Sequence, residues 1–259
     1  TPESCADALV AYLGWHGPAP VPVADPARVA AAAALAHSAA HTRLDERESC
    51  TLFAALGVAV TAHAVWPADG TPGALPDSDG GYAVKILSAD IPHKTDAGLV
   101  RLRIGAADVP GTVASLLRAA RERFPHAHLS GVLVQAMQRG LVEMILGYRR
   151  DPEVGPVVML ALGGVAAELR RERAVRIAPV TLETAREMVA EIPDLALLRG
   201  FRGLPRGDIE ALAQAVASIS RLADPALPVV LEAEMNPLIV KEENHGVIAV
   251  DGLIVLAGG

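Results

Sequence analysis

Two lysines stand close together in a chain that otherwise takes its positive charge from arginine. The lysines of the 259-residue chain are Lys85, Lys94 and Lys241. Lys85 lies in the alternating stretch 82–87, where strand geometry places it on the face opposite Val84 and Ile86. It is either a solvated residue of an edge strand or a buried lysine that faces a cleft. In the second case it is a point charge suited to phosphate groups.

The stretch that follows Lys85 is a polar loop, residues 88–98. Its polar and small residues are Ser88, His93, Lys94, Thr95, Asp96 and Gly98. Hydroxyl groups, a second lysine and a glycine before the next strand suit contacts with phosphate. A polar hairpin loop would have the same composition. Residues 82–101 are therefore a candidate phosphate-binding strand and loop.

A second candidate site lies near the C-terminal end and is acidic. Glu232 and Glu234 alternate along a strand and share a face, Asn236 follows, and Asp251 interrupts the apolar run 247–256. An unpaired buried carboxylate is costly, so Asp251 needs a partner. Carboxylate and amide oxygens suit Mg²⁺, which takes one or two protein carboxylates together with nucleotide phosphates. The alternative is a structural hydrogen-bonded pair that closes a hairpin.

Hydrophobic periodicity and turn residues predict the elements that must position these groups. Helices are expected at 44–56, 109–124, 181–191 and 207–222. Strands are expected at 58–66, 82–87, 99–104, 131–137, 141–148, 156–161, 229–234 and 247–256. This order indicates an α+β protein with two lobes.

The domain boundaries follow from changes in composition. Residues 1–40 contain an alanine-rich segment behind Pro18, Pro20 and Pro22, and are interpreted as a linker or the tail of a preceding domain, with a helix start at Asp25-Pro26. Residues 41–259 form the main domain. Its smaller lobe is expected at about 64–130, and its larger lobe at about 131–259 together with 44–63.

Composition excludes several classes of protein. With 51% hydrophobic and 20% charged residues, the chain is typical of a folded globular protein. No apolar run reaches the roughly 18 to 20 residues that a membrane span needs. A net charge of −7 argues against a nucleic-acid partner. Cys5 and Cys50 have no metal-binding spacing, and a cytoplasmic location is the simplest interpretation.

Four blocks in one order resemble a known family. They are VKILSADIPHKTDAGLVRL, VQAMQRGLVEMILGYRRDPEVGPVVMLALGGVAAEL, LLRGFRGLP, and EAEMNPLIV with AVDGLIVL. Together they resemble the ATP-grasp domain of ADP-forming acetyl-CoA synthetases and their acyl-CoA relatives, over residues 44–256. The resemblance implies an ATP-grasp fold in which two α+β lobes clasp a nucleotide, with ATP or ADP and Mg²⁺ as cofactors.

The resemblance also implies roles for single residues at the nucleotide. Lys85 would hold the phosphates, and Glu143 would face the nucleotide from the strand beyond the hinge. The backbone of the hinge would pair with adenine, and its residues are Val134, Gln135, Ala136 and Met137. Asn236 and Asp251 would bind Mg²⁺, with Glu234 as an auxiliary acid.

Further roles concern phosphoryl transfer. Gly163, Gly164 and Glu168 would receive a loop that carries a phosphohistidine. His93 would act with Lys85 in catalysis as a second phosphoryl carrier, or would only hydrogen-bond phosphate or backbone. The chain departs from the family at Leu99, where a glycine is expected, and at Ala136, where an acid is expected.

The implied activity is that of the nucleotide-binding part of an acid–thiol ligase. It would move a phosphoryl group between ATP or ADP and a phosphohistidine supplied by a separate CoA-binding part. No GxGxxG turn follows a first strand, so the chain is expected to be incomplete alone. One alternative is a degenerate regulatory domain of the kind attached to acetyltransferases. Another is a structural interaction domain.

Overall fold

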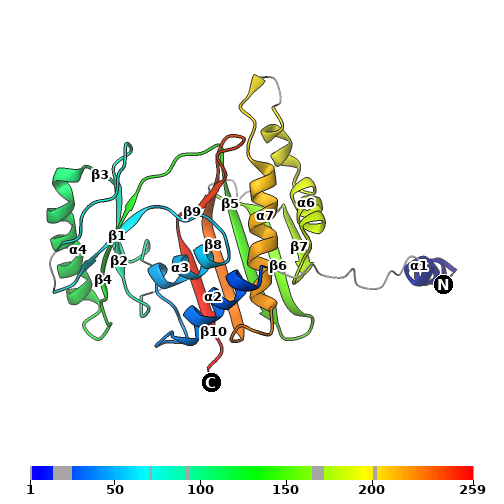
Figure 1. Ribbon diagram of the computed structural model, residues 1–259, viewed down its shortest axis with the longest axis horizontal. Helices are drawn as coiled ribbons and strands as arrows, with labels where there is room; N and C mark the ends of the chain where they lie inside the picture. Colours follow the sequence, from blue (N-terminus) through cyan, green and yellow to red (C-terminus); the bar gives the residue numbers. More distant parts are fainter. Residues whose placement is uncertain are drawn as a thin grey trace.

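Two antiparallel sheets, each with its own helices, lie side by side in the computed structural model (Figure 1). The structure describes residues 2–13, 25–69, 72–91, 94–164, 172–200 and 203–258. The α+β architecture with two lobes is therefore confirmed.

The smaller lobe is a four-stranded antiparallel sheet covered on one face by a single helix. Its strands, in spatial order, are β1 (His63–Pro67), β4 (Gly131–Ala136), β2 (Tyr82–Leu87) and β3 (Val100–Ile104). Helix α4 (Val109–Arg123), preceded by the short helix η1 (Ala106–Asp108), packs on this sheet with Val113, Leu116 and Ala120 buried. Strand β2 is interior, and all six of its residues are buried. Because successive side chains of a strand point to opposite faces of the sheet, alternate residues of β2 point either to the face that α4 covers or to the opposite face.

The larger lobe is a six-stranded antiparallel sheet with helices on one face (Figure 1). Its path is β10 (Gly252–Leu256), β8 (Val230–Val240), β5 (Val142–Asp151), β6 (Gly155–Leu162) and β7 (Arg173–Ile177), and β9 (Val247–Ala249) pairs with β8. The helices are α2 (Pro26–His37), α3 (Glu46–Ala55), α6 (Leu182–Ala190) and α7 (Ile209–Ser220), with short helices η2 (Pro193–Leu198) and η4 (Arg221–Ala223). They enclose the main core.

The structure changes two of the expected boundaries. β4 pairs with both β1 and β2, so it belongs to the smaller lobe, and that lobe ends after Ala136 rather than near residue 130. α2 is a packed helix rather than a linker, because Val29, Ala32 and Ala36 are buried against the main core. Its start is as predicted, with Asp25 accepting a hydrogen bond from the backbone N–H of Ala27.

Two strand predictions also change, and one strand was missed. Of the expected strand 58–66, only residues 63–66 are in a strand, β1, which continues to Pro67. The run 247–256 is divided into β9 and β10, which leaves Asp251 between two strands. β7 was not predicted from the sequence, although its residues pair with β6 along its whole length.

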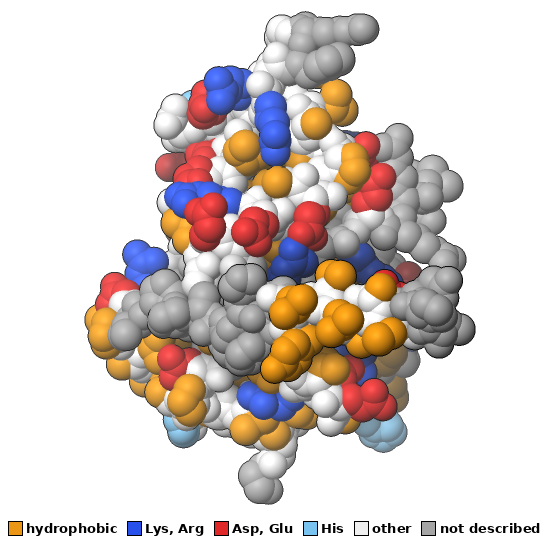
Figure 2. Space-filling view, turned by 90° about the vertical axis from the view of Figure 1, so that its right-hand side faces the viewer, with side chains coloured by type: hydrophobic (Ala, Val, Ile, Leu, Met, Phe, Trp, Pro, Cys, Tyr) orange, Lys and Arg blue, Asp and Glu red, His pale blue; other side chains and the backbone are white. Residues whose placement is uncertain are grey.

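One helix lies apart from the two lobes. α1 (Pro2–Leu13) exposes Leu9, Val10, Tyr12 and Leu13 and is separate from the sheets in Figure 1. Figure 2 views the molecule from this side and shows acidic and basic side chains interleaved over its upper part, above a cluster of hydrophobic ones. No described helix has both the length and the apolar character that a membrane span requires.

Candidate functional site

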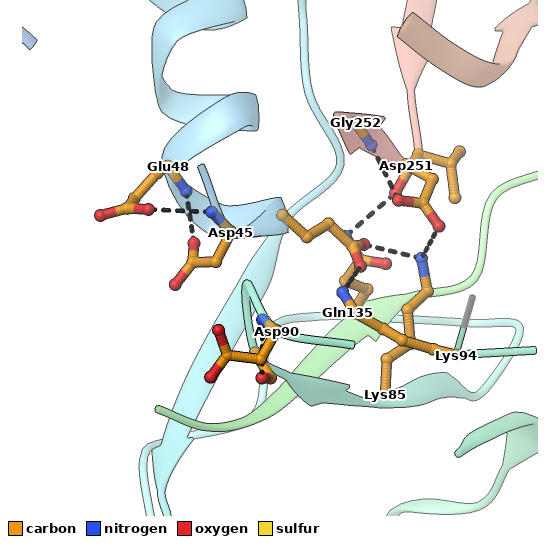
Figure 3. Close-up of polar contacts among 11 residues, drawn as sticks. Asp45, Glu48, Lys85, Asp90, Lys94, Gln135, Asp251 and Gly252 are labelled. Atoms are coloured by element: carbon orange, nitrogen blue, oxygen red, sulfur yellow. Dashed lines mark hydrogen bonds and ion pairs between the residues drawn. The ribbon is translucent and has the colours of Figure 1, made fainter. Parts of the chain in front are cut away.

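Lys85 is a buried cation that points from the smaller lobe towards the larger one. Val84 and Ile86 face α4 in the core of the smaller lobe, so alternation turns Lys85 to the other face of the sheet. Its Nζ donates to Glu46 Oε1 at 2.7 Å and to Asp251 Oδ2 at 3.2 Å (Figure 3). The side chain is only 6% exposed. Of the two interpretations that the sequence left open, the buried lysine is correct.

Glu46, which the sequence prediction missed, is the anion at the centre of the site. It is the first residue of α3, whose N-terminus is fixed by reciprocal hydrogen bonds between Asp45 and Glu48 (Figure 3). The Glu46 carboxylate is 1% exposed and accepts from both Lys85 and Lys94, the latter at 3.3 Å. Two lysines of the smaller lobe are therefore held by one carboxylate of the larger lobe.

The phosphate-loop candidate is folded by local bonds that bring Lys94 to the site. The backbone N–H of Leu99 donates to Lys94 O, and that of Gly98, with φ of 67°, donates to Thr95 O. Leu99 is 1% exposed and packs in the core of the smaller lobe, so this departure from the family removes no polar group from the cleft. His93 lies outside the described residues.

A cleft of about 200 Å³ opens at these groups. Its lining includes Lys85, Lys94, Glu46, Asp251 and Arg43, from both lobes. Burial alone would raise the pKa of Glu46, but the two lysines outweigh it and hold that pKa below its ordinary value. The pKa of Lys85 is raised, because Glu46 and Asp251 outweigh its burial. Glu46 and Lys85 are therefore ionised at neutral pH, whereas burial, together with the neighbouring Glu46, raises the pKa of Asp251.

A hairpin brings the acidic candidates together. Gly252 of β10 is in register with Met235 of β8, and the backbone N–H of Asn236 donates to Asp251 O at 3.4 Å. The Asn236 amide donates to Glu234 Oε1 at 3.1 Å. Asp251 Oδ1 accepts from the Gly252 backbone N–H, and its Oδ2 faces Lys85. Asp251 therefore connects the acidic hairpin to Lys85.

These acids line a second cleft of about 390 Å³, which adjoins the first. Glu232, Glu234, Asn236 and Asp251 all contribute to it. Oxygen donors of this type suit Mg²⁺. In the part of the chain that is described, no group of three or more His, Cys, Asp or Glu side chains is arranged to hold a metal.

The predicted hinge is arranged differently from the expectation. Val134 and Gln135 lie in the middle of β4 and pair with strands on both sides. The backbone N–H of Ala136 donates to Ala62 O, and that of Met137 donates to Gly81 O. The backbone donors expected to meet adenine are thus used within the protein. Ala136 and Met137 line a separate cleft of about 380 Å³.

Gln135 contributes its side chain instead of its backbone. Its Nε2 donates to Val250 O at 3.1 Å, next to Asp251, and so connects the two lobes (Figure 3). Its Oε1 is buried without a hydrogen-bond partner among the described residues. An unpaired buried acceptor is unfavourable by about 1–3 kcal/mol.

Glu143 and the glycine pair lie against one another. The backbone N–H of Gly163 donates to Glu143 O at 2.8 Å, and a Cβ on Gly163 would lie 3.0 Å from that oxygen. A Cβ on Gly164, with φ of 65°, would lie 3.1 Å from Glu143 Oε2. Close packing on Glu143 is thus a structural reason for both glycines. Glu168 lies outside the described residues.

The stability contributed by Glu46 should disappear in acid. A carboxylate with a lowered pKa stabilises the fold fully above its unfolded value of 4.5, and this contribution is lost as the pH falls through the folded value. Glu46→Gln is expected to lower the unfolding free energy by about 3 kcal/mol at pH 7. The difference from wild type should shrink below pH ~4.5. Urea unfolding at several pH values measures it, with the exposed Glu122→Gln as control.

Residues 35–256 match the family described as ATP-grasp domain. The chain belongs to this ATP-grasp family.

Individual relatives of the chain are ADP-forming acetate–CoA ligases. The chain is 40% identical over 170 residues to the ADP-forming acetate–CoA ligase I of Archaeoglobus fulgidus, covering 65% of this chain and 25% of the ligase. It is 38% identical over 179 residues to the β subunit of the ADP-forming acetate–CoA ligase I of Pyrococcus furiosus, covering 68% of this chain and 76% of the subunit. The chain thus spans a quarter of the first relative and about three quarters of the second.

Two solved structures are similar to this chain. The dinucleotide-forming acetyl-coenzyme A synthetase 1 of Ca. Korarchaeum cryptofilum, in complex with coenzyme A, Ca-AMPCP and HgCl⁺, superposes with a TM-score of 0.69 at 30% identity, covering 83% of this chain and 93% of that one. PH1788 of Pyrococcus horikoshii superposes with a TM-score of 0.76 at 26% identity, covering 90% and 99%.

Proposed function

We propose that the chain is the nucleotide-binding part of an ADP-forming acyl-CoA synthetase, an acid–thiol ligase. The observation that carries the proposal is the interlobe cluster of Lys85, Lys94, Glu46 and Asp251. It places two lysines beside an acidic hairpin at the cleft of an ATP-grasp fold. Positioning and charge neutralisation are the main protein contributions to phosphoryl transfer.

Within this proposal Lys85 and Lys94 hold the phosphates of ATP or ADP. Asp251, Asn236 and Glu234 hold Mg²⁺, which neutralises phosphate charge when it is bound. Because Lys85 and Asp251 now pair with one another, metal and phosphate would separate them on binding. The base would lie towards Ala136 and Met137. A cytoplasmic location stays a prediction.

The partner in this proposal is a CoA-binding part that supplies a phosphohistidine. One structure of the Ca. Korarchaeum cryptofilum synthetase holds coenzyme A and Mg-AMPPCP, with its phosphohistidine segment pointing towards the nucleotide binding site. Gly163, Gly164 and Glu168 are proposed to receive such a segment, and His93 is proposed to accept its phosphoryl group. The phosphoryl group is then transferred between His93 and the nucleotide.

Titration calorimetry of the folded chain with Mg·ADP and Mg·ATP tests the proposal. Micromolar binding is expected for both, and no thioester should form when acid, CoA and ATP are added to the chain alone. Circular dichroism provides the check that the chain is folded. A folded chain that binds neither nucleotide would contradict the proposed function. Thioester formation by the chain alone would contradict the need for a partner.

A further inference from the structure

Arg43 lies where the two clefts meet. It lines the cleft of Lys85 and Lys94 as well as the cleft of Glu234 and Asn236. The residues shared by the two linings are Arg43, Asp251, Gly252 and Leu253. The clefts are therefore two ends of one groove, with lysines at one end and carboxylates at the other, and Arg43 at the junction.

The backbone holds Arg43 firmly in this place. It is paired with Val255, the Leu44 N–H donates to Ile254 O at 3.0 Å, and the Leu256 N–H donates to Thr42 O. Residues 42–44 thus form a short extra edge beside β10. Glu46, which contacts both lysines, lies three residues after Arg43. The same segment therefore carries both Arg43 and the central anion of the site.

Arg43 differs from the two lysines of the groove in its ion pairing. Lys85 is paired with Glu46 and Asp251, and Lys94 is paired with Glu46. Arg43 is half-buried, and its guanidinium has neither a hydrogen bond nor an ion pair with any residue that the structure describes. It is an uncommitted cation at the junction. A nucleoside diphosphate carries more negative charge than one Mg²⁺ neutralises, so a further cation at this junction suits it.

We infer that Arg43 is a phosphate-binding residue that contacts the nucleotide phosphates where the two clefts join. The inference rests on the proposed function and adds a residue to its site. A guanidinium presents paired N–H donors that match two phosphate oxygens, which a lysine cannot do. Arg43 would act directly on phosphate, whereas Asp251 would act through the metal.

Titration calorimetry with ADP, with and without Mg²⁺, tests this assignment. Arg43→Met keeps most of the side-chain volume and is expected to weaken ADP binding about tenfold by the same factor in both conditions, because the contact is to phosphate. Arg43→Lys keeps the charge and should lose less. Arg47→Met is the matched control, since Arg47 is exposed on the first turn of α3 and lines neither cleft.

The outcomes separate the inference from the proposed function. Equal affinities in Arg43→Met, Arg47→Met and wild type would overturn the inference and leave the proposed function standing. A loss confined to Mg²⁺-containing solutions would also overturn it, because Arg43 would then act on the metal site. If Arg43→Met does not fold, Arg43→Lys with a wild-type unfolding midpoint and wild-type affinity would overturn it. A wild-type chain without ADP binding would overturn the proposed function and the inference together.

Discussion

Lys85→Met is expected to weaken nucleotide binding strongly and to destabilise the protein. Its loss leaves Glu46, which is 1% exposed, with Lys94 as its remaining partner. Removing one member of a buried ion pair lowers the unfolding free energy by about 3 kcal/mol or more. Affinity for Mg·ADP should fall by about 100-fold, because the phosphates lose a charge-assisted donor. Urea unfolding and calorimetry measure the two effects separately.

A double variant shows whether these effects have different origins. In Lys85→Met with Glu46→Gln, the buried carboxylate that has lost Lys85 is gone, so part of the stability should return. Nucleotide affinity should stay low, because neither substitution restores the cation. Arg118→Met is the control, since Arg118 is exposed on α4 of the same lobe and lines none of the three clefts. Recovery of binding in the double variant would mean that Lys85 acts only by holding the fold.

Local pattern was sufficient to predict the orientation of Lys85 but not its partner. Strand alternation depends on residues 82–87 alone, and β2 has these bounds in the structure. The contact with Glu46 joins residues 39 positions apart. An acid in the first turn of a helix is common, because it complements the helix dipole. Nothing in the sequence around Glu46 therefore separates it from an exposed acid.

The acidic hairpin could be predicted because its parts are close in sequence. Asn236 lies in β8 and Asp251 directly precedes β10, so the antiparallel pairing of these two strands brings them together. The pairing of the hinge residues was harder to predict. They lie in a buried apolar strand, and its sequence does not show which sheet it joins. β4 in fact has partners on both sides, which uses the backbone groups of Val134 and Gln135. Only tertiary pairing decides which backbone groups remain for a ligand.

The packing of α2 shows a related limit. Its buried residues are mainly alanines, which bury little area each and give no clear amphipathic pattern. Alanine-rich sequence is therefore compatible with both an exposed linker and a closely packed helix. β7 was not predicted because Arg173 and Arg176 break the apolar pattern of a strand of only five residues.

Asp251→Asn is expected to abolish the effect of Mg²⁺ on nucleotide affinity while leaving the fold almost unchanged. The Asp251 side chain is 45% exposed, and Lys85 keeps its bond to Glu46, so the stability loss should be about 1 kcal/mol or less. An amide carries no negative charge for the metal, so Mg·ADP should bind no better than ADP alone. Calorimetry with and without Mg²⁺ measures this difference.

Without Mg²⁺, the same substitution should have the opposite sign. Asp251 Oδ2 lies 3.2 Å from Lys85 Nζ and competes with phosphate for that cation. Removing its charge should therefore leave metal-free ADP binding unchanged or tighten it a few-fold. Asp96→Asn is the matched control, because Asp96 lines the first cleft but not the second. Equal weakening with and without Mg²⁺ would mean that Asp251 acts by positioning Lys85 rather than by holding the metal.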